Sequence, residues 1–168
     1  MEEELFGKNA RLIVSEMDGI ITDGTYAEDE IGNVFYKVYQ SRDFDAINDL
    51  KKYFKFVFLS SDNRINYNMC RRRNIPFYWG KNEKEKYDRL IEILRRYSCT
   101  PDETIYIASM ISDRKCAQLI PESICPDDAG EYLKNICFAN FVKNGGQGIF
   151  SELLYLLQDR IKNIKNSE

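Results

Sequence analysis

Short apolar runs alternate with amphipathic stretches along this chain, and this alternation limits the possible folds more than any other feature. The runs are rich in β-branched and aromatic residues, which is typical of buried parallel strands. They are Leu12–Val14, Phe56–Leu59, Thr104–Ile107 and the weaker runs Ile124–Cys125 and Ile136–Phe138. The alternation predicts an α/β fold, a Rossmann-like three-layer sandwich in which helices cover both faces of a central parallel sheet.

Apolar residues between these runs recur at helical spacing. The clearest stripes are Ile47, Leu50 and Tyr53; Tyr87, Leu90, Ile91, Leu94 and Tyr97; and Phe150, Leu153, Leu154, Leu157, Ile161 and Ile164. We expect these stripes to pack in the core rather than to bind a ligand. A length of 168 residues fits one hydrophobic core, so we predict a single domain over residues 1–168.

Residues 25–41, "TYAEDEIGNVFYKVYQS", interrupt the alternation. Two β-prone arms flank Ile31-Gly32-Asn33, which predicts a β-hairpin inserted after the first strand. The hairpin should therefore lie near the carboxyl end of the sheet or against a neighbouring molecule.

Composition excludes several classes of function. Lys and Arg number 24 against 27 Asp and Glu, and this net charge of −3 argues against a nucleic-acid partner. No apolar stretch approaches the ~18 residues of a membrane span, and the acidic N-terminus lacks the apolar core of a signal peptide. The five scattered cysteines are typical of reduced thiols, so we expect a cytoplasmic protein.

The chain has no histidine, which excludes Ser-His-Asp and Cys-His catalysis, histidine phosphatases and histidine-ligated zinc. In α/β sheets, ligands bind beyond the carboxyl ends of the strands. The polar residues that follow the predicted strands are therefore the candidates for a site: Glu16, Asp18, Ser60, Ser61 and residues 109–113.

The stretch "EMDGIITDG" at residues 16–24 resembles the D-x-D-G-V-L-T-D-G signature of the haloacid dehalogenase superfamily. Further landmarks follow in the family's order: "FVFLSSDN", a lysine in the helix of "YWGKNEKEKYDRL", and "ASMISD" in place of G-D-D-x-x-D. "QSRDFDAI" and "NGGQGIFSEL" are similar to the family's "NVRDGYGI" and "GGRGAVREV", with Gln147 in place of an arginine. The resemblance spans about Leu12 to Leu157. It points to the capless branch, which includes 3-deoxy-D-manno-octulosonate 8-phosphate (KDO 8-phosphate) phosphatase and the C-terminal domain of animal N-acylneuraminate cytidylyltransferase.

The resemblance implies a phosphatase site that uses Mg²⁺. It assigns Glu16 to the position of the nucleophile, Asp18 to that of the general acid/base, and Lys86, or alternatively Lys84, to the neutralising lysine. The implied phosphate-binding residues are Ser60, Ser61, Arg42 and Lys86. The implied metal-binding residues are Glu16, Asp18, Ser109 and Asp113.

Several of these positions depart from the family's pattern. Glu16 extends its carboxylate by one methylene beyond an aspartate, and a misplacement of about 1 Å can slow a reaction about 100-fold. Ser109 replaces an acid that binds Mg²⁺, and Met110 offers a thioether that suits a hard ion poorly. Asp62 stands where the family has an arginine. We therefore expect a weakened Mg²⁺ site.

Simpler interpretations stay open for the same residues. Glu16 could be a relict acid that is solvated or paired with Lys86, and Lys86 could belong to a solvated helix start. Asp113 could cap the following helix, and Arg42-Asp43 could be an ordinary pair at a helix start.

Three hypotheses for function follow. The first is a degenerate, non-catalytic phosphatase-like domain with an assembly or regulatory role, related to the metabolism of keto-sugar acid phosphates. By the resemblance it would form a homotetramer through hairpin residues Val34, Phe35, Tyr36, Val38 and Tyr39. The second is an active Mg²⁺-dependent sugar-phosphate phosphatase that uses Glu16. The third is a module that binds a phosphorylated ligand through Ser60 and Lys86 without turnover.

Overall fold

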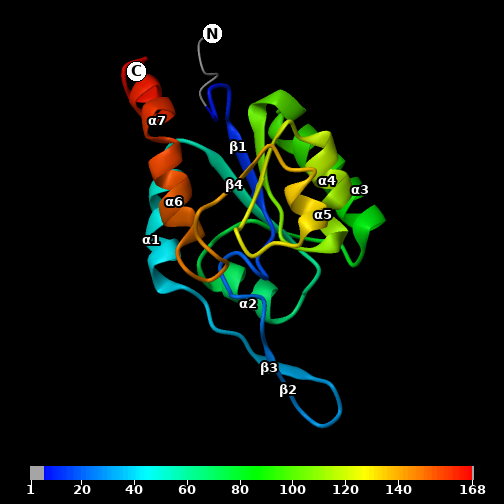
Figure 1. Cartoon of the computed structure of the whole chain (residues 1–168). Helices are drawn as coiled ribbons and strands as arrows, with labels where there is room; N and C mark the ends of the chain where they lie inside the picture. The colour runs from blue at the N-terminus through cyan, green and yellow to red at the C-terminus, as the bar shows by residue number, and fades with distance from the viewer. Residues whose placement is uncertain (1–5, 168) are drawn as a thin grey trace.

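A parallel sheet of six strands forms the centre of the computed structural model, which describes residues 6–167 (Figure 1). The strand order is β5-β4-β1-β6-β7-β8, and every pairing is parallel. The strands are β1 (Leu12–Ser15), β4 (Lys55–Ser60), β5 (Phe77–Trp79), β6 (Thr104–Ile107), β7 (Glu122–Cys125) and β8 (Ala139–Asn140). This arrangement confirms the predicted α/β fold.

Helices cover both faces of the sheet and complete the three layers (Figure 1). The side chains of α1, α2, α6 and α7 pack in the core on one face, and those of α3, α4 and α5 pack on the other. Their bounds are α1 (Ser41–Leu50), α2 (Ile65–Arg72), α3 (Glu83–Tyr97), α4 (Arg114–Leu119), α5 (Glu131–Lys134), α6 (Ile149–Leu156) and α7 (Gln158–Lys165). Short 3₁₀ turns precede β6 and α4, at Pro101–Glu103 and Ile111–Asp113.

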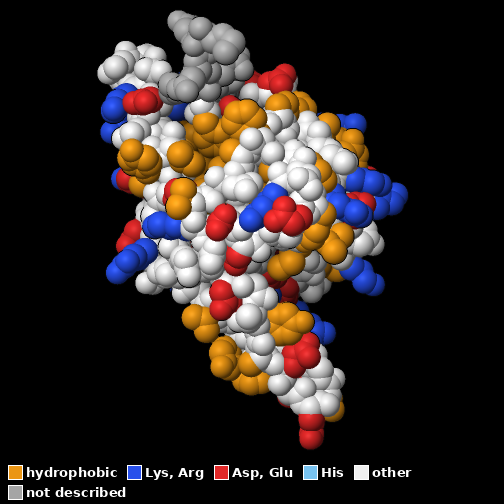
Figure 2. All heavy atoms as spheres, viewed as in Figure 1, with side chains coloured by type: hydrophobic (Ala, Val, Ile, Leu, Met, Phe, Trp, Pro, Cys, Tyr) orange, Lys and Arg blue, Asp and Glu red, His pale blue; other side chains and the backbone are white. Residues whose placement is uncertain are grey.

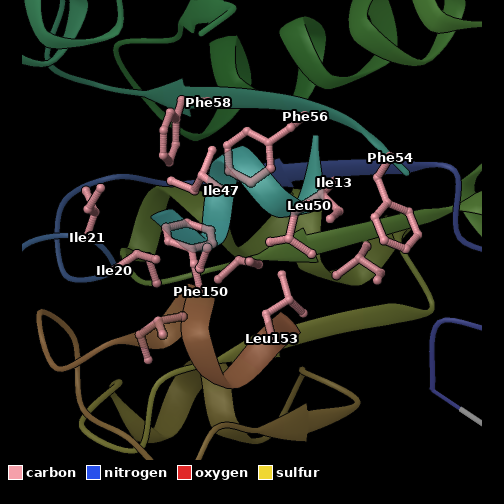
Figure 3. Close-up of a cluster of buried hydrophobic side chains, with 14 of the residues drawn as sticks. Ile13, Ile20, Ile21, Ile47, Leu50, Phe54, Phe56, Phe58, Phe150 and Leu153 are labelled. Atoms are coloured by element: carbon pink, nitrogen blue, oxygen red, sulfur yellow. The ribbon is translucent and has the colours of Figure 1, made fainter. Parts of the chain in front are cut away.

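Strand β4 shows how the apolar runs produce these layers. Successive side chains of a strand point to opposite faces, so Phe56 and Phe58 enter one core and Val57 and Leu59 the other. The ring of Phe150 on α6 meets Phe56 and Phe58 edge-on, with centroids 5.4 and 5.8 Å apart (Figure 3). Such aromatic pairs add about 0.5–1.5 kcal/mol each beyond burial, and they fix α6 against the sheet.

One strand prediction needs correction, and one strand was missed. The run Ile136–Phe138 is a turn after α5, because the backbone N–H groups of Ile136 and Cys137 both donate to the carbonyl of Leu133. Pairing with β7 begins only at Phe138, which donates to Ser123, so β8 starts one residue later. The short edge strand β5 was not predicted.

The predicted hairpin is confirmed. Strands β2 (Ala27–Glu28) and β3 (Val34–Tyr36) pair antiparallel and project from the body of the molecule (Figure 1). The end of the predicted segment, Ser41, already belongs to α1.

The topology places the carboxyl end of β1 at the centre of one edge of the sheet. The chain crosses from β1 to β4 and β5 on one side and later returns to β6 on the other. This reversal of strand order is where open α/β sheets bind ligands. Among residues 6–167, no helix combines the length and apolar character needed to cross a lipid bilayer.

Candidate functional site at the carboxyl edge of the sheet

Glu16 lies at the centre of this edge, directly after β1. Its backbone N–H donates to the carbonyl of Ile107 at 3.0 Å, which extends the β1–β6 ladder by one residue. The side chain is fully buried. Oε1 accepts from the backbone N–H of Met17 at 2.8 Å, and Oε2 accepts from Nζ of Lys86. The interpretation of Glu16 as a solvated acid is therefore wrong, and the pairing with Lys86 is confirmed.

Lys86 reaches Glu16 from the first turns of α3. Asn82 caps this helix by accepting from the N–H of Glu85 at 3.0 Å. Gly80 lets the helix start approach closely, since a Cβ there would lie 2.7 Å from the backbone nitrogen of Lys86. The Lys86 side chain is fully buried, so the interpretation as a solvated helix start is wrong. The alternative lysine, Lys84, is exposed and pairs with a neighbour on its own helix.

Asp113 supplies the second carboxylate around Lys86. Its Oδ1 accepts from Lys86 Nζ at 2.8 Å and from the hydroxyl of Tyr106 at 2.7 Å. Its Oδ2 accepts from the backbone N–H groups of Ser109 and Met110 at 2.9 and 2.8 Å. The side chain makes no capping bond to α4 itself. By accepting from the backbone of Met110, it caps the 3₁₀ turn Ile111–Asp113 that leads into α4, and it holds the loop after β6.

One ammonium faces two buried carboxylates in this cluster. Burial lowers the pKa of Lys86, but the charges of Asp113 and Glu16 outweigh it and raise that pKa. Burial raises the pKa of Glu16; Lys86 opposes this rise, and the nearby charge of Asp113 adds to it. Glu16 is thus a fully buried carboxyl group whose pKa is raised and whose negative charge is partly offset by Lys86.

Asp18 lies two residues beyond Glu16 and belongs to a second cluster. Its Oδ1 accepts from Lys37 Nζ at 2.7 Å, and its Oδ2 accepts from the side-chain amide of Asn66 at 3.1 Å. The same amide donates to the hydroxyl oxygen of Ser60 at 3.0 Å. Ser60 is fully buried, so this cluster brings together two of the predicted site residues.

Sequence reasoning missed Lys37 and Asn66. Lys37 also pairs with Asp62 at 2.6 Å. A usable signal was present, because an acid at the family's arginine position is stabilised by a cation from elsewhere in the chain. The hairpin carries that cation in its second arm.

The remaining predicted residues lie at the margin. Ser61 is exposed, and its carbonyl accepts from the indole N–H of Trp79 at 3.2 Å. Ser109 is half-buried against the first loop, since a Cβ on Gly19 would lie 2.1 Å from its Oγ. Arg42 is exposed in the first turn of α1, and its backbone N–H donates to Gln40.

Asp43, next to Arg42, has a role that was not predicted. It is buried, and its Oδ1 accepts from the backbone N–H groups of Phe150 and Ser151 at 3.1 and 3.4 Å. It therefore caps the first turn of α6 rather than forming a helix-start pair with Arg42. Burial raises the pKa of Asp43 to about 6, against the opposing effect of these two hydrogen bonds.

The side chains at this edge do not fit a Mg²⁺ ion. Each carboxylate oxygen of Glu16, Asp18 and Asp113 already accepts from a protein donor. Two ammonium groups, those of Lys86 and Lys37, supply positive charge next to these acids. Within residues 6–167, no group of three His, Cys, Asp or Glu side chains is arranged to hold a metal ion.

Solved structures share this fold. KDO 8-phosphate phosphatase from Haemophilus influenzae, determined with cobalt bound, is 26% identical with a TM-score of 0.83, covering 93% of this chain and 92% of that chain. The enzyme from Moraxella catarrhalis, solved with magnesium, phosphate and KDO, is 16% identical with a TM-score of 0.84, covering 99% of both chains. The enzyme from Yersinia pestis is 18% identical with a TM-score of 0.84, covering 97% of this chain and 89% of that chain.

No protein-family model and no curated protein matches the sequence. The structural likenesses nevertheless confirm the haloacid dehalogenase-like fold and the resemblance to KDO 8-phosphate phosphatases. Because these relatives are phosphatases, they support the hypothesis of an active phosphatase better than that of a non-catalytic domain.

Proposed function

We propose that this chain is a phosphatase-fold protein whose edge site does not hydrolyse phosphate esters by the metal-dependent route, and that it has an assembly or regulatory role. One observation carries the proposal. The Glu16 carboxylate, at the position of the nucleophile, is fully buried and held by Lys86 and by the backbone of Met17.

In-line attack requires a carboxylate oxygen to approach phosphorus closely, in near-attack geometry. The side chain of Glu16 is fully buried, and each of its carboxylate oxygens is held by a protein donor, so one oxygen would have to be uncovered before it could attack. Burial also raises the pKa of Glu16, and the charge of Lys86 opposes this rise. Phosphoryl transfer depends on positioning and on charge neutralisation, and Ser109 removes one of the charges that would hold a metal.

The hairpin supports the assembly role. It presents exposed apolar side chains on both arms and at its turn, and Figure 2 shows several of them gathered on this projection. They are Tyr26, Ile31, Phe35, Tyr36 and Val38. Exposed apolar side chains that gather on one projection are typical of protein–protein contact sites. We propose that the hairpin joins copies of this chain, as a tetramer.

Light scattering on the purified protein tests the assembly role. We expect an oligomer at micromolar concentration that Phe35→Ser/Val38→Ser dissociates. The matched control is Tyr155→Ser, which removes an exposed aromatic ring from α6 and should leave the mass unchanged. A monomeric wild-type protein would refute the assembly role.

The second candidate is an active phosphatase that acts on a phosphorylated keto-sugar acid, and the structural neighbours favour it. By the resemblance of the motifs, Asp18, Lys86 and Ser60 correspond to functional residues of the family, and Glu16 is the group that would attack. Divalent metal dependence would come with this function, as in the relatives solved with cobalt and magnesium.

Phosphate release separates the two candidates. The assay uses p-nitrophenyl phosphate and an 8-phosphorylated keto-sugar acid, with and without Mg²⁺, on wild type, Glu16→Ala and Glu16→Asp. We expect no turnover by wild type. Turnover that Glu16→Ala abolishes would establish the phosphatase and refute our proposal. Calorimetric binding without turnover, weakened by Ser60→Ala, would instead support a phosphate-binding module.

A further inference from the structure

Lys37 connects the hairpin to the edge of the sheet. It follows β3 in the returning arm, and its ammonium lies 2.7 Å from Asp18 Oδ1 and 2.6 Å from Asp62 Oδ2. The lysine side chain is only 3% exposed, whereas the two acids are 17% and 21% exposed. A nearly buried ammonium therefore stands between two carboxylates that would repel each other without it.

A second side chain of the same arm strengthens this connection. The hydroxyl of Tyr39 donates to the side-chain oxygen of Asn66 at 2.7 Å, and Asn66 in turn donates to Asp18 and Ser60. Asn66 is fully buried at the start of α2. The base of the hairpin, the first loop and α2 thus share one hydrogen-bonded network with Asp18 at its centre.

We propose that Lys37 is a tethered counter-ion: it supplies the cation that Asp18 and Asp62 require, and its contact with them fixes the hairpin to this edge. The inference rests on the proposed function in one respect, that wild type holds no metal here. It adds a coupling between the hairpin and the site, because losing the ammonium would leave two like charges unpaired and remove one of the contacts that hold the returning arm.

If the proposal is correct, a free metal cation should be able to replace the positive charge of the Lys37 ammonium. Ca²⁺ binds carboxylate oxygens at about 2.3–2.6 Å in flexible geometry, close to the Lys37 contacts. Removing the ammonium should therefore create a weak Ca²⁺ site between Asp18 and Asp62. Mg²⁺ requires shorter, near-octahedral contacts and should bind less well there.

The experiment compares Lys37→Met with Lys52→Met, which removes an exposed lysine paired with Asp49. Thermal melts are recorded in NaCl and in CaCl₂ of equal ionic strength, together with chymotrypsin cleavage of the hairpin. We expect Lys37→Met to melt roughly 10 °C below wild type, as for loss of one partner of a largely buried ion pair, with faster hairpin cleavage. Millimolar Ca²⁺ should reverse part of both changes. Lys52→Met and wild type should not respond.

Lys37→Gln/Asp62→Asn removes one of the two like charges, and with it their repulsion, and serves as the second variant. We expect it to melt closer to wild type than Lys37→Met and to ignore Ca²⁺. Melting of Lys37→Met at the wild-type temperature, or equal losses in NaCl and CaCl₂, would overturn the proposal. If Lys37→Met does not fold, a folded double variant supports the counter-ion role and an unfolded one overturns it. Turnover by wild type would refute the proposed function, whereas a loss of stability in Lys37→Met that Ca²⁺ does not reverse would overturn the counter-ion role alone.

Discussion

Replacing Lys86 by Met tests whether the buried cluster is held together by charge. The change keeps an unbranched side chain of similar length, so it removes the ammonium with little loss of packing. Glu16 and Asp113 would remain fully buried without their shared partner. Burial of an unpaired charge is what makes such a change costly.

The magnitude follows from this burial. Removing one partner of a buried ion pair costs about 3–5 kcal/mol in the free energy of unfolding. For a protein of this size, 1 kcal/mol lowers the melting temperature by about 2–4 °C, so a loss of roughly 6–20 °C is expected. Lys84→Met is the matched control, because Lys84 lies on the same helix but is 80% exposed. It should leave the melting temperature nearly unchanged.

The stabilisation by Lys86 should depend on pH, and the direction follows from its raised pKa. The raised pKa of Lys86 means that its stabilisation is complete below the unfolded lysine pKa of about 10.5 and is lost as pH rises through the folded value. Lys86 opposes the rise in the pKa of Glu16, so without Lys86 the folded state binds a proton at Glu16 more readily, and Lys86→Met should be closer to wild type at pH 5 than at pH 8. Adding Glu16→Gln to Lys86→Met should recover part of the stability that Lys86→Met loses. Equal melting of Lys86→Met and Lys84→Met, or no gain from Glu16→Gln, would refute the reasoning.

Two further changes test the packing and the cap of α6. Phe150→Ala removes the ring that meets Phe56 and Phe58 and should cost about 3–5 kcal/mol in urea denaturation, whereas Tyr155→Ala on the exposed side of the same helix should cost far less. The pKa of Asp43 is raised from 3.8 to about 6 in the folded state. Between about pH 4 and pH 6 the folded state therefore keeps a proton that the unfolded state has lost, and the contribution of Asp43 to the free energy of unfolding falls as pH rises. Asp43→Asn keeps an accepting oxygen without that loss, so its melting temperature relative to wild type should increase between pH 4 and pH 7; a constant difference would contradict the assignment.

The sheet was predictable because its central strands are buried on both faces. A strand that is buried on both faces is apolar at successive positions, as Phe56–Leu59 is, and can therefore be recognised from its own residues. The edges were less predictable, since Ile136–Phe138 is as apolar as a strand but is held in a turn by the carbonyl of Leu133. Periodicity alone cannot tell whether a short apolar run forms a strand or a turn.

The site was predictable only in part, for a different reason. Glu16, Asp18, Lys86 and Asp113 stand at positions that the family's motifs mark, and the structure brings Glu16, Lys86 and Asp113 into contact. Whether Lys86 is buried could not be read from its neighbours, because Glu83, Lys84 and Glu85 suggest a solvated helix start. Burial there depends on Gly80 and on how α3 meets the sheet.

Lys37 illustrates a compensation that no local pattern contains. Asp62 reverses the charge expected after β4, and taken alone this change would destabilise the edge by repelling Asp18. The hairpin folds back and places Lys37 between the two acids. A second lysine, Lys86, balances Glu16 and Asp113 in the same way. Ammonium groups of this chain therefore supply the positive charge beside the acids at this edge.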